Sequence, residues 1–127
     1  MIIMKYDEQR DYQNILNSII GEKWQSFYEE RKEEYKIALN NSMTYVIYDE
    51  KYCGYLRAIT DKVFTIFIAE IIVEKDSRNK GYGKKLIEYV QNLFPSARID
   101  LISDEDEFYQ KIGFRNLGNG MRRHNWY

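Results

Sequence analysis

The chain has 127 residues, of which 44% are hydrophobic, 31% charged and 16% aromatic, with a formal net charge of -1. This length predicts a single domain over residues 1–127, since chains below about 150 residues usually form one core. The lone Cys53 excludes an internal disulfide, and a Cys/His zinc site is excluded because His124 is the only histidine. We therefore expect no metal cofactor.

The sequence predicts neither export nor insertion into a membrane. The longest apolar run lies around Ile71–Val73 and is far too short to span a bilayer. Residues 1–5 lack the apolar core and the cleavage site of a signal peptide. These features predict a cytoplasmic protein without a membrane partner.

The N-terminal third predicts one short strand and two helices. The strand covers Ile2–Met4, Asp7 offers an N-cap, and an apolar stripe in residues 15–20 indicates a helix that Gly21 ends. A second helix is expected from about Glu22 to the polar residues 40–42. Its buried face is predicted to comprise Trp24, Phe27, Tyr28, Arg31, Tyr35, Ala38 and Leu39.

The middle of the chain changes to the pattern of β-structure. Residues 44–48, 52–59 and 63–73 are rich in β-branched and aromatic residues and are separated by short polar turns, which predicts an antiparallel meander. The third of these strands ends in a nearly continuous apolar run with Glu70 inside it. A carboxylate in a buried strand is a candidate functional residue, because burial of an unpaired charge is costly.

The C-terminal part alternates helix and strand. A helix is predicted over Gly81–Phe94 and ends before Pro95, followed by a strand over Ala97–Ile102. Residues 103–106 resemble a capping box ahead of a short helix over Glu107–Ile112. Residues 114–117 and 121–127 are predicted to pair as a terminal hairpin. The order of elements predicts an α/β (α+β layered) domain with a mixed sheet.

Residues 75–85 are the basic part of the chain, with five lysines or arginines and Asp76 as the only acid. Nucleic acid would require a wider basic surface, so we expect no nucleic-acid partner. Within this segment Arg78–Gly83 stands between a strand and a helix, where glycines and free helix N-H groups favour a compact phosphate site. On these residues alone, a glycine-containing loop with surface lysines stays an equal alternative. The segment matches neither a P-loop nor the dinucleotide fingerprint.

Two segments resemble the GNAT superfamily of acetyl-CoA-dependent N-acetyltransferases. Arg78-Asn79-Lys80-Gly81-Tyr82-Gly83 is similar to its Arg/Gln-x-x-Gly-x-Gly/Ala signature, and Phe108–Phe114 is similar to its Phe-Tyr-x-Lys-x-Gly-Phe segment. The resemblance implies a mixed, mostly antiparallel sheet with helices on both faces. It also implies that acetyl-CoA binds along Ile71, Ile72 and Val73 and in the loop of Arg78, Asn79, Lys80, Gly81, Tyr82, Gly83 and Lys84.

The same resemblance assigns candidate catalytic residues. Tyr109 matches the tyrosine that protonates the departing thiolate, and its phenol can instead orient the sulfur or simply pack. Glu70 is a candidate general base for the attacking amine, because burial among isoleucines would raise its pKa. The alternative for Glu70 is a structural carboxylate paired with an arginine or a tyrosine. Asp100 on the neighbouring strand, or solvent, are the other candidate bases.

The resemblance implies transfer of acetyl from acetyl-CoA to a primary amine of a small molecule, by direct attack in a ternary complex. Acetylation of a protein N-terminus or lysine, and a non-catalytic acetyl-CoA-binding module, are alternatives. A homodimer is left open. His124, Arg122 and Arg123 lie outside both motifs, and the sequence assigns them no role.

Overall fold

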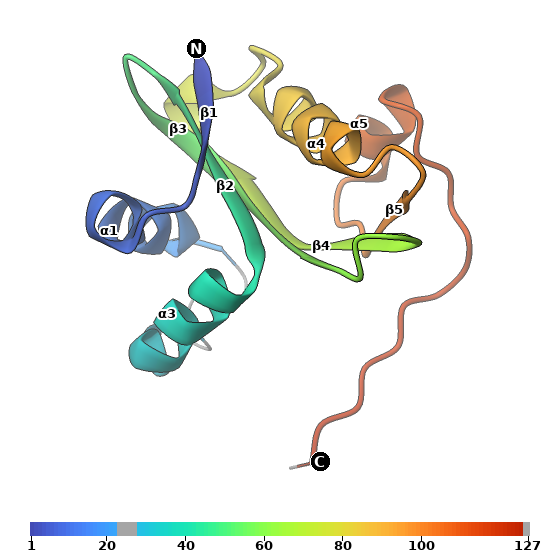
Figure 1. Ribbon diagram of the computed structural model, residues 1–127, viewed down its shortest axis with the longest axis horizontal. Coiled ribbons are helices and arrows are strands. Elements are labelled where there is room, and N and C mark those ends of the chain that lie inside the picture. The colour runs from blue at the N-terminus through green and yellow to red at the C-terminus, as the bar shows by residue number, and fades with distance from the viewer. Residues whose placement is uncertain (23–27, 126–127) are drawn as a thin grey trace.

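The computed structural model describes residues 1–22 and 28–125, which form one five-stranded sheet with helices on both faces (Figure 1). The strands follow chain order across the sheet, and only the last one is parallel to its neighbour. The strands are β1 (Ile2–Lys5), β2 (Met43–Asp49), β3 (Lys51–Thr60), β4 (Thr65–Val73) and β5 (Arg98–Leu101). The helices are α1 (Glu8–Ile19), α3 (Lys32–Asn41), α4 (Tyr82–Leu93) and α5 (Asp106–Lys111), with a 3-10 turn, η1, at Lys75–Ser77.

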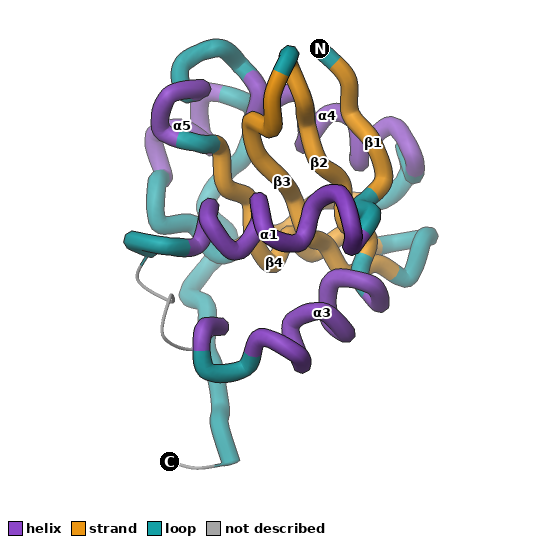
Figure 2. The backbone as a smooth tube through the Cα atoms, turned by 90° about the vertical axis from the view of Figure 1, so that its left-hand side faces the viewer, coloured by secondary structure: helices purple, strands orange, loops and turns teal. Residues whose placement is uncertain are grey.

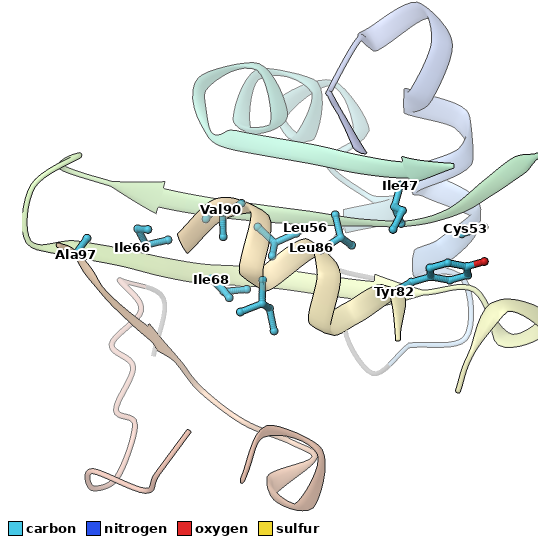
Figure 3. Packing of buried hydrophobic residues seen from close by; sticks show 11 residues of the cluster. Ile47, Cys53, Leu56, Ile66, Ile68, Tyr82, Leu86, Val90 and Ala97 are labelled. Carbon is cyan, nitrogen blue, oxygen red and sulfur yellow. The ribbon is translucent and has the colours of Figure 1, made fainter. Parts of the chain in front are cut away.

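Two hydrophobic clusters fill the space between the sheet and its helices. Helices α1 and α3 lie across one face of the sheet, as Figure 2 shows, and cover the cluster around Ile15, Leu39 and Tyr55. Helix α4 covers the other face. Figure 3 shows its side chains pointing toward β3 and β4, with the labelled residues Leu56, Ile66, Ile68, Leu86 and Val90. The predicted layered α/β fold is confirmed.

A β-bulge at Ala69 divides β4 into two halves whose buried side chains point to opposite faces of the sheet. Ile68 lies opposite Ala58 of β3 and Glu70 opposite Arg57, so Ala69 has no counterpart across the strand pair. Ile68 therefore packs in the cluster under α4, whereas Ile72 packs in the cluster under α1 and α3. The extra residue shifts the alternation of side chains by one position. Glu70 consequently faces α3.

Several predicted elements are confirmed with shifts of one or two residues at their ends. Asp7 caps α1, and its carboxylate accepts a hydrogen bond from the Arg10 amide at 2.9 Å. Helix α4 ends at Leu93, two residues before Pro95. Along the described segments of the chain, no helix is both long and apolar enough to cross a membrane.

The prediction of one continuous second helix is wrong. The chain turns at Glu30 and Arg31, where Arg31 has φ -127° and ψ 40°, and α3 begins at Lys32. The helical periodicity of the sequence continues unbroken through this turn. The geometry is instead decided by the packing of Tyr35 and Leu39 against the sheet. Trp24 and Phe27 of the predicted buried face lie outside the described residues.

Two predictions near the C-terminus are also wrong. Residues 114–125 form no strand and therefore no hairpin, and Leu117 and Met121 are 72% and 90% exposed. A two-stranded hairpin is marginal in water unless a further strand or helix covers it. Ser103 does not cap a helix. Its hydroxyl accepts from the Glu105 amide at 3.1 Å, and α5 begins at Asp106 without a side-chain cap.

Candidate active site

The parallel pair of β4 and β5 separates partway along β4. Their pairing runs from Thr65 and Arg98 to Ile68 and Leu101, while β4 continues to Val73 and stays paired with β3 as far as Gly54. In the described part of the chain, the backbone of residues 69–73 therefore has one edge without a paired strand, and this edge includes Ile71–Val73. Free N-H and C=O groups at such an edge are available to hydrogen-bond an extended ligand.

The loop between β4 and α4, at the end of this gap, has the backbone geometry of an anion site. Asn79 and Gly81 have φ of 65° and 82°, in the left-handed region that lets the chain turn sharply into the helix. The first helical hydrogen bond runs from the Lys85 amide to the Gly81 carbonyl at 3.0 Å. The amides of residues 82–84 precede it, and no side chain caps them. These N-H groups and the helix dipole favour a bound anion.

The side chains of this loop have different surroundings. Lys80 and Lys84 are exposed, so their charges are free to face a ligand. Arg78 donates from Nε to the Val73 carbonyl at 2.9 Å and so ties the loop to the end of β4. Tyr82 is turned inward, and its hydroxyl donates to the Asp49 carboxylate, an interaction that raises the pKa of the phenol to about 12. Tyr82 can therefore contribute only its backbone amide to a ligand.

Gly83 lies at the meeting point of β4, α4 and α5. A Cβ at this position would be 3.2 Å from the Phe108 ring and 3.8 Å from a Val73 methyl group. The Phe108 side chain gives little room for that atom, so a larger residue would push α5 away from the gap. The second glycine of the motif is thus explained by close packing rather than by its backbone angles.

Tyr109 lies on α5 between two aromatic rings. Its ring centroid is 5.0 Å from that of Phe108 and 5.5 Å from that of Phe114, both in edge-on geometry. Burial, with smaller contributions from Asp104 and Glu105, raises the pKa of Tyr109 to about 12. Within residues 1–22 and 28–125, the Tyr109 hydroxyl has no hydrogen-bond partner. It is therefore a protonated donor available to a ligand.

Glu70 is the centre of a buried hydrogen-bond network. The Arg57 Nε lies 2.8 Å and 3.0 Å from its two carboxylate oxygens, and a terminal nitrogen of Arg57 also bonds to Oε2. The Tyr35 hydroxyl donates to Oε1 at 2.7 Å and the Tyr28 hydroxyl to Oε2 at 3.2 Å. These bonds occupy the roughly four lone-pair positions of a carboxylate. Glu70 thus has the paired arrangement that the sequence left open as the alternative to a base.

Sequence reasoning missed the partners of Glu70. Arg57 is the only charged residue in the apolar strand 52–59, and the meander places it on the strand next to Glu70. One cation and one carboxylate on neighbouring apolar strands indicate an ion pair, but only the register of the two strands shows that these residues lie opposite each other. Asp100 lies in the part of β5 that is still paired, opposite Phe67. It does not face the open part of the gap.

The C-terminal residues outside both sequence motifs do not lie beside the gap between β4 and β5. Arg122, Arg123 and His124 lie in the segment that follows α5 and leads away from the sheet (Figure 1). No cluster of three or more histidine, cysteine or acidic side chains with the spacing of a metal site occurs in the part of the chain that the structure describes.

Comparison with known proteins identifies the family. The profile of the acetyltransferase (GNAT) domain family matches residues 40–116, which is more than half of the chain. The chain therefore belongs to the GNAT acetyltransferase family. The match includes β2 to β5, the anion loop and Tyr109.

Individual proteins agree with this assignment. The uncharacterized N-acetyltransferase ycf52 of Pyropia yezoensis is 29% identical over 103 residues, which cover 72% of this chain and 59% of that protein. The chain spans from 33% to 59% of the length of the curated relatives it matches.

Two solved structures show the same fold. A GNAT-family acetyltransferase of Xanthomonas campestris has a TM-score of 0.74 at 18% identity, covering 98% of this chain and 94% of that one. An aminoglycoside 6'-N-acetyltransferase in complex with coenzyme A has a TM-score of 0.70 at 19% identity, covering 93% and 87%.

The network around Glu70 predicts that Arg57→Met destabilises the fold by about 3–5 kcal/mol, because it leaves a buried carboxylate without its cation. Urea unfolding measures this difference. The control is Arg31→Met, which removes an exposed pair with Glu34 and should change the free energy of unfolding far less, because solvent screens exposed ion pairs. A loss of similar size in both variants would contradict the assignment of Glu70 to a buried ion pair.

Proposed function

We propose that this chain is an N-acetyltransferase that transfers acetyl from acetyl-CoA to a primary amine. The observation that carries this proposal is the free edge of β4 at residues 69–73, directly next to the anion loop at residues 78–84. A strand edge followed by a phosphate site suits an extended ligand that bears a pyrophosphate at one end and amide groups along its arm. Membership of the GNAT family supports the same ligand.

Each part of the coenzyme then has a place along this path. The amides of residues 82–84 hold the pyrophosphate, with Lys80 and Lys84 contributing charge, and the free edge of Ile71–Val73 pairs with the amides of the pantetheine arm. The thioester carbonyl accepts a hydrogen bond from a backbone N-H near Val73. That bond strengthens as negative charge develops on the oxygen during attack, which lowers the barrier.

The acceptor in this proposal is the primary amine of a small molecule, which attacks the thioester directly while both substrates are bound. The aminoglycoside 6'-N-acetyltransferase of the same fold is named for a small-molecule substrate, which supports this class. The reaction needs no metal. We place the protein in the cytoplasm.

Release of coenzyme A thiol tests the proposal. Purified protein with acetyl-CoA and a panel of small amines should release thiol only when an amine is present, and acetyl-CoA alone should raise the melting temperature. Thiol release that requires a peptide with a free N-terminus or lysine would replace the small-molecule acceptor. Stabilisation by acetyl-CoA without release by any amine would indicate a binding module, and no stabilisation at millimolar acetyl-CoA would refute the proposal.

The saturated carboxylate of Glu70 predicts that the acceptor loses its proton to solvent rather than to this residue. The value of kcat/KM should then rise with pH up to the pKa of the acceptor amine, because only the neutral amine attacks. Glu70→Gln should keep this profile and change its height by less than about tenfold. Loss of a general base would lower the rate by about a hundredfold or more. Loss of the rising limb in Glu70→Gln, in a variant whose melting curve shows that it is folded, would assign the base role to Glu70.

The pKa of Tyr109 predicts an orienting role for its phenol. Full proton transfer from a group with a pKa of about 12 to a thiolate, whose thiol has a pKa near 8.5, is uphill. A hydrogen bond to the charged sulfur is worth about 1.5–3 kcal/mol, so Tyr109→Phe should lower kcat roughly 10- to 100-fold with acetyl-CoA affinity unchanged.

The matched control for Tyr109→Phe is Tyr45→Phe. Tyr45 lies on β2, which β3 separates from β4, and packs against Tyr89 at 5.0 Å between ring centroids. Steady-state rates and calorimetric binding of acetyl-CoA should be unchanged in this control. Equal rates for Tyr109→Phe and the wild type would remove Tyr109 from the reaction.

A further inference from the structure

Gly54 of β3 lies directly against the last two residues of β4. Its partner across the strand pair is Val73, where β4 ends. A Cβ at Gly54 would lie 2.5 Å from the Ile72 carbonyl oxygen, 3.4 Å from the Ile72 carbonyl carbon and 3.1 Å from the Val73 Cα. The shortest of these distances is far inside the roughly 3.5 Å at which non-bonded heavy atoms make favourable contact. All three atoms belong to one peptide unit, which joins Ile72 to Val73.

This close approach distinguishes Gly54 from the other glycines of the chain. Gly54 is not among the glycines with positive φ, so its backbone conformation does not require glycine. The other glycines have open space or side-chain atoms where a Cβ would lie, whereas Gly54 alone would meet backbone atoms. A glycine inside a strand often marks a site where another backbone comes close. Gly54 is therefore needed for the contact between β3 and the end of β4.

The peptide that touches Gly54 also presents an N-H group to the gap. The Glu74 amide donates to the Cys53 carbonyl at 2.8 Å, so the N-H of residue 74 points toward β3. The N-H groups of successive residues in an extended strand point to opposite edges. The Val73 N-H consequently points away from β3, to the edge that faces the gap. The described chain has no cis peptide bond, so the Ile72 carbonyl points the other way, toward Gly54.

The two ends of this peptide cannot move independently. A peptide unit is planar and stiff, so a group that displaces the Ile72 carbonyl also tilts the Val73 N-H. Within the described residues, no strand pairs with Val73 on the side of the gap to resist such a tilt. On that side the next carbonyl, that of Val73, accepts a hydrogen bond from Arg78 Nε at 2.9 Å. The direction of the Val73 N-H therefore depends on the contact with Gly54.

We propose that Gly54 is a positioning residue for acetyl transfer. Because it has no side chain, β3 approaches β4 closely enough to hold the Ile72–Val73 peptide with the Val73 N-H directed at the thioester carbonyl. This role rests on the proposed function, which places acetyl-CoA in the gap. A donor of this kind lowers the barrier only when it is aimed at the oxygen on which charge develops. Gly54 lies outside both sequence motifs and acts through the peptide rather than by contact with the coenzyme.

The variant Gly54→Ala tests this role. It should fold with a lowered melting temperature, because β4 ends at Val73 and the end of the strand can move away from the added methyl group. We expect kcat to fall about 10- to 100-fold, since a displacement of about 1 Å in a reacting geometry can cost a hundredfold. If the variant is unfolded in buffer, trimethylamine N-oxide favours the folded state for both proteins. A variant that stays unfolded there would make Gly54 a requirement of the fold and overturn the positioning role.

A binding measurement separates positioning from a loss of stability. In S-ethyl-CoA a CH2 group replaces the thioester carbonyl of acetyl-CoA, so the two ligands differ only in the group that the Val73 N-H is proposed to bind. By calorimetry without an amine, the wild type should bind acetyl-CoA roughly 3- to 10-fold more tightly than S-ethyl-CoA. Gly54→Ala should bind both with about equal affinity, and its affinity for S-ethyl-CoA should stay within about threefold of the wild type.

The matched control is Ile66→Val, near the start of the same strand. Ile66 is fully buried, so the smaller side chain lowers the melting temperature without touching the Ile72–Val73 peptide. Its preference for acetyl-CoA should equal that of the wild type. A preference retained in Gly54→Ala, or lost equally in Ile66→Val, would overturn the positioning role.

The wild type alone distinguishes failure of this role from failure of the proposed function. Equal binding of acetyl-CoA and S-ethyl-CoA would show that the Val73 N-H is not the carbonyl donor, which overturns the role of Gly54 and leaves the acetyltransferase function standing. Binding of neither ligand would refute the proposed function, and the role of Gly54 with it.

Discussion

The single extra residue in β4, Ala69, is the constraint on which the rest of the molecule depends. Because it shifts the alternation of side chains, the first half of β4 packs under α4 and the second half under α1 and α3. The pairing with β5 ends one residue before this bulge, at Ile68. Three features follow from the bulge at Ala69. They are the free backbone edge, the inward position of Glu70 and the approach of the anion loop to Val73. A bulge placed next to a site reorients the chain without adding any catalytic side chain.

This arrangement explains how a chain with one histidine and one buried cysteine can belong to a family of enzymes. The thioester of acetyl-CoA is already activated, so a protein that binds it has to orient two substrates and polarise one carbonyl. Backbone amides can do both when a strand edge and a helix N-terminus leave them unpaired. The buried carboxylate of Glu70 then has a different task. Together with Arg57, Tyr28 and Tyr35 it connects β3 and β4 to α3 and to the chain before it.

The sequence predicts the features that depend on neighbouring residues. It fails where contacts with residues distant in the chain determine the structure. The cap at Asp7, the stop before Pro95 and the glycine loop before α4 depend on a few neighbouring residues, and the structure confirms them. The bulge at Ala69 has no local signal, because the run from Ile66 to Val73 is almost continuously apolar. The turn at Arg31 interrupts a helical pattern that is regular on both sides. The glycines of residues 118–120 predict a hairpin after α5, but residues 114–125 pair neither with each other nor with the outer edge of β5, and an isolated hairpin is marginal in water.

The gap between β4 and β5 depends on how far the two strands stay paired. Strand β5 is joined to the sheet by four residue pairs, all with β4, and it forms one wall of the path proposed for the coenzyme. Because this pairing ends at Ile68 and Leu101 while β4 continues to Val73, the backbone of residues 69–73 keeps the free edge on which the proposed coenzyme site depends.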